Sequence, residues 1–152
     1  MKEKIKRKKW HIGLVLWILV IWGFSVQPGE ASTDTSNGVL AFLTNILQWM
    51  GIATNFSAVF IRKMGHFAEY FILGMLLFQV MQGKERSWGR EVFFLLLLGI
   101  VIAGIDESIQ YFVPGRSAQI ADVLLDFCGV VMGFFIMMGF YRWLKKKRSI
   151  RL

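Results

Sequence analysis

Four long apolar segments alternate with basic stretches along this chain of 152 residues. They cover Trp10–Phe24, Met64–Met81, Val92–Ile105 and Ala121–Trp143. The chain is 55% hydrophobic and has a mean hydropathy of +0.51, whereas soluble domains are about 45–50% apolar. Because roughly 20 apolar residues in a helix span a bilayer, the pattern predicts an all-α integral membrane protein of one domain.

The expected fold is a four-helix transmembrane bundle over residues 10–143, between a basic N-terminus (1–9) and a basic tail (144–152). A basic start before a short apolar run is also typical of a cleaved signal peptide. The chain continues through Ser25–Glu30 without an A-x-A cleavage site, which favours retention of the first helix. The four helices are expected at about 10–26, 64–81, 91–111 and 120–143.

The positions of the basic residues predict the orientation. Fifteen of the 18 lysines and arginines lie in the N-terminus, the loop 83–91 and the segment from Arg142 onward. Only Arg62, Lys63 and Arg116 fall on the opposite side. The positive-inside rule therefore places both termini in the cytoplasm of a multi-pass protein. The formal charge of +8 lies at the membrane edges, so we expect the lipid bilayer, and not nucleic acid, as the partner.

The long outer loop between the first two helices, residues 25–62, contains a helical pattern of its own. Apolar residues recur on one face, and Ala41, Thr44, Asn45 and Gln48 occupy the other. This predicts an amphipathic helix on the outer membrane surface. A helix packed over the mouth of the bundle explains the pattern equally well. The apolar face consists of Val39, Phe42, Leu43, Ile46, Leu47 and Met50.

Polar and ionisable side chains gather where the second, third and fourth helices meet the outer side of the membrane. Within the helices they recur three or four residues apart, which places them on one helical face. Ionisable side chains at membrane depth are costly and commonly mark a functional site. We therefore expect one polar pocket, open to the outside, that binds a ligand. Its expected residues are Lys63, His66, Glu69, Tyr70, Asp106, Glu107, Gln110, Arg116, Asp122 and Asp126.

The charge of this expected pocket is unbalanced, with five carboxylates against one lysine, one arginine and one histidine. A low-dielectric site holds that imbalance only if carboxyl groups are protonated or a cation binds. Carboxylates with a single imidazole favour Mg²⁺, Ca²⁺ or Mn²⁺ over a structural zinc ion. Ion pairs and glutamine hydrogen bonds that merely join helices are the alternative. The candidate metal ligands are Glu69, Asp106, Glu107 and Asp126.

Three separated motifs resemble the VanZ-like family of small bacterial membrane proteins. They are FSVQ (Phe24–Gln27), KMGHFAEYFILG (Lys63–Gly74) and DESIQYFVPGRSAQIADVLLDFCG (Asp106–Gly129). The resemblance covers about residues 20–140, and the motifs occur in the family's order. It implies a place in the bacterial cell envelope. The family's namesake is linked to low-level teicoplanin resistance in Gram-positive bacteria, so the resemblance implies that phenotype but no reaction.

Three functions are compatible with the pocket. The first is binding or modification of a lipid or cell-wall precursor, with Lys63 and Arg116 holding a phosphate. The second is a hydrolase or transferase, with Glu69, Asp106 or Glu107 as base and His66 as acid. No G-x-S-x-G or H-E-x-x-H motif identifies a nucleophile or a zinc site. The third, an ion- or proton-coupled transporter, is least favoured because the inner helix halves are apolar. The sequence gives no oligomeric state.

Overall fold

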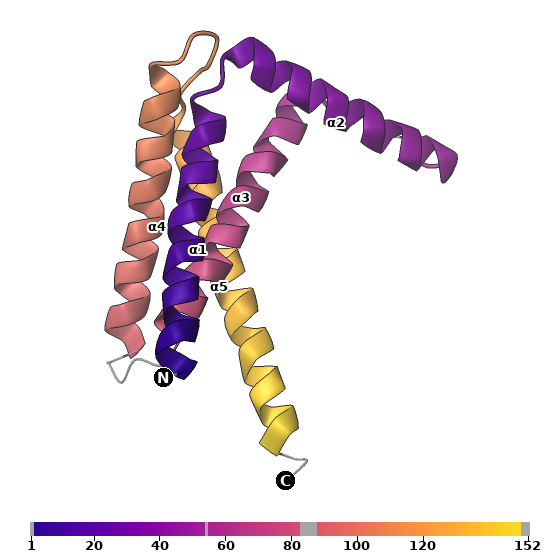
Figure 1. The fold of residues 1–152 in the computed structure, drawn as a ribbon. Coiled ribbons are helices and arrows are strands. Elements are labelled where there is room, and N and C mark those ends of the chain that lie inside the picture. The colour runs from indigo at the N-terminus through magenta and orange to yellow at the C-terminus, as the bar shows by residue number, and fades with distance from the viewer. Residues whose placement is uncertain (1, 54, 83–87, 150–152) are drawn as a thin grey trace.

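The computed structural model describes residues 2–53, 55–82 and 88–149 (Figure 1). In these residues the chain is entirely helical, which confirms the all-α prediction. The five helices are α1 (Lys2–Ser25), α2 (Gly29–Trp49), α3 (Ala58–Met81), α4 (Trp88–Tyr111) and α5 (Ile120–Ser149).

Three of these helices are long and apolar enough to cross a membrane. They are α3, the part of α4 from Val92 to Tyr111, and the part of α5 from Ile120 to Lys147. Helices α1 and α2 meet the same criterion only as a pair, and that pair is bent by 105° at the break between them. The expectation of a membrane protein is thus supported by three helices, and a separate crossing by α1 stays a prediction.

Helices α1, α3, α4 and α5 lie side by side, whereas α2 leaves the end of α1 and projects away from them (Figure 1). The contact between α3 and α5 is the most extensive in the described chain. It depends on glycine, because a Cβ atom at Gly74 would collide with the Val130 carbonyl and one at Gly133 with the Phe71 carbonyl. The Gly129-x-x-x-Gly133 pattern of α5 therefore lies at a close backbone contact.

The core of the bundle is apolar and is built mainly from α3 and α5. Tyr70, Leu73 and Leu77 of α3 are fully buried, as are Val130 and Phe134 of α5. Outside this core, many large apolar side chains point away from the protein. They include Phe93, Phe94 and Val101 of α4 and Phe135 and Ile136 of α5. An apolar exterior on helices of this length is consistent with a lipid environment.

The observed helices extend beyond the predicted bounds. Helix α3 starts at Ala58 and not at residue 64, because the Ser57 hydroxyl accepts a hydrogen bond from the Phe60 N–H at 3.1 Å and caps the helix. The basic segments also continue neighbouring helices: α1 begins at Lys2, and α5 runs to Ser149. Charged residues with long side chains are good helix formers, so an apolar pattern underestimates these ends.

Helix α2 is the helix predicted in the long outer loop. Its first half packs against the bundle, since Ser32 and Ser36 are buried there. Its second half extends beyond the bundle with large apolar side chains uncovered, including Phe42 at 65% exposure and Trp49 at 89%. The first half of the helix is therefore packed against the bundle, and contact of its outer half with the membrane surface stays a prediction.

Candidate functional site

Buried polar side chains concentrate at one end of the bundle, where α1 and α4 end and α3 and α5 begin. This is also the end from which α2 projects (Figure 1). Among the described residues, every buried polar or charged side chain belongs to this end or to the first half of α2. They are Ser25, Ser32, Ser36, Asp106, Glu107, Gln110 and Asp126.

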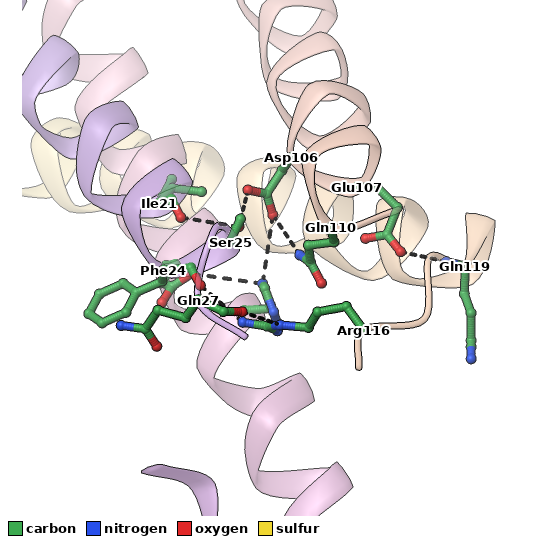
Figure 2. A network of polar contacts seen from close by, with 11 residues as sticks. Ile21, Phe24, Ser25, Gln27, Asp106, Glu107, Gln110, Arg116 and Gln119 are labelled. Carbon is green, nitrogen blue, oxygen red and sulfur yellow. Dashed lines mark hydrogen bonds and ion pairs between the residues drawn. The ribbon is translucent and has the colours of Figure 1, made fainter. Parts of the chain in front are cut away.

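Asp106 is the centre of this polar region and is completely buried (Figure 2). The Ser25 hydroxyl at the end of α1 donates a hydrogen bond to its Oδ1. The Gln110 side-chain amide, one helical turn further along α4, donates to Oδ2 at 3.1 Å. Two donors from two helices therefore fix the orientation of this carboxylate.

His66 and Asp126 complete a compact group with Asp106, which we call the central cluster. One donor atom from each of the three residues lies within 4.8 Å of the others. His66 Nδ1 is 3.9 Å from Asp106 Oδ2 and 3.8 Å from Glu69 Oε2. Asp126 is only 1% exposed, and Tyr70 of α3 is fully buried with no hydrogen-bond partner for its hydroxyl among the described residues.

Several polar atoms of this group are buried without a hydrogen-bond partner. They include His66 Nδ1, Glu69 Oε2 and Asp126 Oδ1. A buried polar atom that lacks a partner costs about 1–3 kcal/mol, so natural proteins rarely bury three together. The arrangement is therefore suited to holding a cation, a shared proton or a polar group of a ligand.

The contacts of three further predicted residues lie away from the central cluster. Lys63 forms an ion pair with Asp122 that joins α3 to α5 at the rim. Glu107 accepts a hydrogen bond from the Gln119 N–H in front of α5 (Figure 2). Glu107 thus satisfies a free amide at the start of α5, and it lines a separate cleft between the ends of α4 and α5.

Arg116 turns toward the end of α1 rather than toward the carboxylates. Its Nη2 donates to the Phe24 carbonyl at 2.9 Å and its Nε to the Gln27 carbonyl at 3.2 Å (Figure 2). The Phe24 carbonyl lies in the last turn of α1 and the Gln27 carbonyl just beyond it, so the guanidinium caps this end of the helix. Burial, followed by the charge of Arg62, lowers the pKa of Arg116, although a guanidinium stays protonated at neutral pH.

A cleft of about 390 Å³ lies between α2, the start of α3 and the end of α1. His66 and Glu69 line it, so the cleft leads to the central cluster. Arg62 and Arg116 add two cationic groups to its wall. Its apolar lining consists of Phe24, Val39, Leu43, Ile61 and Met64.

A family model described as VanZ/LLP1 matches residues 10–144. The chain belongs to the VanZ/LLP1 family. The match confirms the resemblance carried by the three motifs, and it includes the whole central cluster and the cleft. No curated protein and no solved structure matches the chain.

Three residues of this VanZ/LLP1 site were not among those expected from the sequence. Ser25 orients Asp106, and the Trp17 indole N–H donates to the Glu69 carbonyl at 2.9 Å. Arg62 lines the cleft. Ser25 lies in the FSVQ motif, so the motif was the signal that could have placed it in the site. Trp17 carries no comparable signal, because an indole in an apolar helix is indistinguishable from core packing.

Proposed function

We propose that this VanZ/LLP1 protein binds the phosphate-bearing headgroup of an envelope lipid or lipid-linked cell-wall precursor in the cleft under α2. The observation that carries the proposal is the mixed lining of the cleft, with two arginines, a histidine and a glutamate opposite apolar walls. Arginine is well matched to phosphate oxygens, and the apolar walls are suited to the first carbons of a lipid chain.

The size of the cleft supports this choice. About 390 Å³ is near the lower end of the range of small-molecule sites, roughly 300–1,000 Å³. Such a volume suits a headgroup with the start of its chain better than an entire lipid. The rest of the ligand would remain in the bilayer, beside the exposed apolar surface of the bundle.

The proposed topology places the cleft at the outer leaflet. In this arrangement α1, α3, α4 and α5 all cross the bacterial cell membrane, and both termini lie in the cytoplasm. The charge distribution supports it, because fifteen of the 18 basic residues then face inward. Helix α2 would lie at the outer surface, with Phe42 and Trp49 in the interface.

A change in antibiotic susceptibility is the first test of this function in cells. We expect expression in a Gram-positive host to protect selectively against teicoplanin, whose lipid tail brings it to the membrane surface, and not against vancomycin. Glu69→Gln and Arg62→Ala, which alter the cleft, should remove the protection. Lys145→Ala, on the exposed end of α5, is the matched control. Unchanged protection in both cleft variants at equal membrane levels would refute the proposal.

Binding of a defined ligand is the second test. Native mass spectrometry of the purified protein would compare a polyprenyl pyrophosphate, the corresponding polyprenol and inorganic pyrophosphate. The proposal requires the polyprenyl pyrophosphate to bind best, with weaker binding by Arg62→Ala. Equal binding of the polyprenol would show that the arginines do not select phosphate, and tightest binding of inorganic pyrophosphate would exclude a contribution from the apolar walls.

The central cluster favours one further candidate, a hydrolase or transferase that acts on the same ligand. Glu69 borders both the cleft and His66, at 3.8 Å from its Nδ1, and is the best-placed general base for an attacking water. Release of phosphate from the polyprenyl pyrophosphate by the wild type but not by Glu69→Gln would support catalysis. For a transporter, buried polar side chains should continue to the other end of the bundle, and among the described residues they do not.

A further inference from the structure

We infer that His66, Asp106 and Asp126 bind a divalent cation of the Mg²⁺ or Mn²⁺ class beneath the cleft. Three helices supply the ligands: α3 carries the imidazole, and α4 and α5 carry one carboxylate each. The inference extends the proposed function, because such an ion would lie at the base of the cleft. The inference depends only on the central cluster, however, so cation binding can be tested separately from the ligand of the cleft.

The distances within the cluster are close to those of a coordination sphere. Metal–ligand bonds of about 2.0–2.3 Å leave neighbouring ligand atoms roughly 3–4.5 Å apart. The donor atoms of the cluster lie within 4.8 Å of one another, and His66 Nδ1 is 3.9 Å from Asp106 Oδ2. A small side-chain adjustment would therefore bring all three onto one ion.

The charge of the cluster also favours a cation. Within the described chain, the ion pairs of Glu69 and Asp106 involve only His66, and Asp126 has none. Two nearby cations make other contacts, since Lys63 pairs with Asp122 and Arg116 donates to the end of α1. Buried carboxylates without a lysine or arginine partner are costly, and a divalent ion would neutralise them directly.

Asp126 provides the evidence that is independent of the clustering. It is 99% buried, with only 1% of its surface exposed, and its Oδ1 has no hydrogen-bond partner. Asp106, in contrast, is held in place by Ser25 and Gln110. An oriented carboxylate beside an unsatisfied one is the pattern of a metal site with its supporting shell, in which hydrogen bonds fix the first ligands.

The ligand set limits the kind of ion. One imidazole nitrogen with two carboxylate oxygens lacks the thiolates of a structural zinc site. Mn²⁺ accepts both nitrogen and oxygen ligands, and Mg²⁺ commonly uses one or two carboxylates and completes its octahedron with water. Glu69, whose Oε2 is also unsatisfied, is placed to contact such a water or to act as a fourth ligand.

Mn²⁺ binding to the full-length protein tests the site directly. The protein in nanodiscs of zwitterionic lipid would be titrated with Mn²⁺, and free Mn²⁺ would be followed by electron paramagnetic resonance. Asp126→Asn and His66→Gln remove a ligand each with little change in shape. Asp122→Asn is the matched control, one turn away on α5, because its carboxylate pairs with Lys63 at the rim.

We expect one saturable Mn²⁺ per chain, displaced by excess Mg²⁺, and roughly tenfold or greater loss of affinity in the two ligand variants. Asp122→Asn should bind like the wild type. Mn²⁺ should also raise the thermal unfolding midpoint of the wild type but not of Asp126→Asn, which reports on the site even if one variant is poorly folded. No saturable binding to the wild type would overturn the inference. An equal loss of Mn²⁺ affinity in Asp122→Asn would also overturn the inference, because Mn²⁺ would then be attracted by the overall negative charge and not by specific ligands.

Discussion

Alanine substitutions along α5 test whether backbone contact with α3 holds the bundle together. A methyl group at Gly129 would lie 2.7 Å from the Phe67 carbonyl oxygen, about 0.7 Å inside an ordinary contact of 3.4 Å. At Gly133 it would overlap the Phe71 carbonyl more deeply, whereas at Gly139 nothing lies within 4 Å. The three glycines therefore form a graded series within a single helix.

The expected free energies follow from two opposing effects. Overpacking a well-packed interface costs about 1–3 kcal/mol, and alanine gains about 0.8–1.0 kcal/mol over glycine in helix propensity. Gly129→Ala should therefore lower the free energy of unfolding by roughly 0–2 kcal/mol. Gly133→Ala should lower it further, and Gly139→Ala should leave it unchanged or raise it slightly.

Unfolding by sodium dodecyl sulfate in mixed micelles, followed by circular dichroism, would measure this order. The helices separate without losing their helicity completely, so a tertiary signal such as tryptophan fluorescence should be recorded in the same titration. The reasoning would be refuted if Gly133→Ala unfolded at the same detergent fraction as Gly139→Ala. Close approach of the α3 and α5 backbones would then contribute nothing to stability.

Three smaller predictions use the same unfolding assay. A double-mutant cycle on Lys63 and Asp122 should give a coupling below about 1 kcal/mol, because these side chains are 38% and 25% exposed; a much larger value would mean that the pair is effectively buried. Ser25→Ala should cost about 1–3 kcal/mol, since Asp106 loses a donor in a buried position, and an unchanged midpoint would contradict that. Trp17→Phe should cost about 0.5–1.5 kcal/mol for its hydrogen bond to α3, and a cost near zero would show that water replaces the indole.

The sequence was sufficient for the helices but not for all of their ends. Apolar segments of membrane length predict helices directly, and all four predicted helices occur. The start of α3 depends instead on the cap at Ser57, outside the apolar pattern. The side of α2 that packs against the bundle could not be read from the apolar pattern either, because Ser32 and Ser36 are the residues buried there. Small polar residues permit close approach, whereas sequence patterns emphasise large apolar residues.

The site was predicted as one pocket, and the structure distributes its residues more widely. Adjacent residues of a helix point about 100° apart, so Asp106 and Glu107 cannot face the same neighbour. Asp106 joins the central cluster, and Glu107 turns to the start of α5. Arg116 reaches the carbonyls at the end of α1, a tertiary contact that spacing along the sequence does not reveal.

The close contact of α3 with α5 has a consequence for biogenesis. These helices are not neighbours in the sequence, and α5 is synthesised after α3 and α4. Until α5 packs, Asp106 lacks the neighbouring Asp126, and the α3 backbone at Phe67 and Phe71 lacks the glycine surface of α5. A nascent chain therefore leaves the Asp106 carboxylate without this cover until α5 has been made, and a product truncated before α5 would present that polar face to proteases. Synthesis of α5 is therefore the step that brings Asp126 to His66 and Asp106 and the glycine surface to α3.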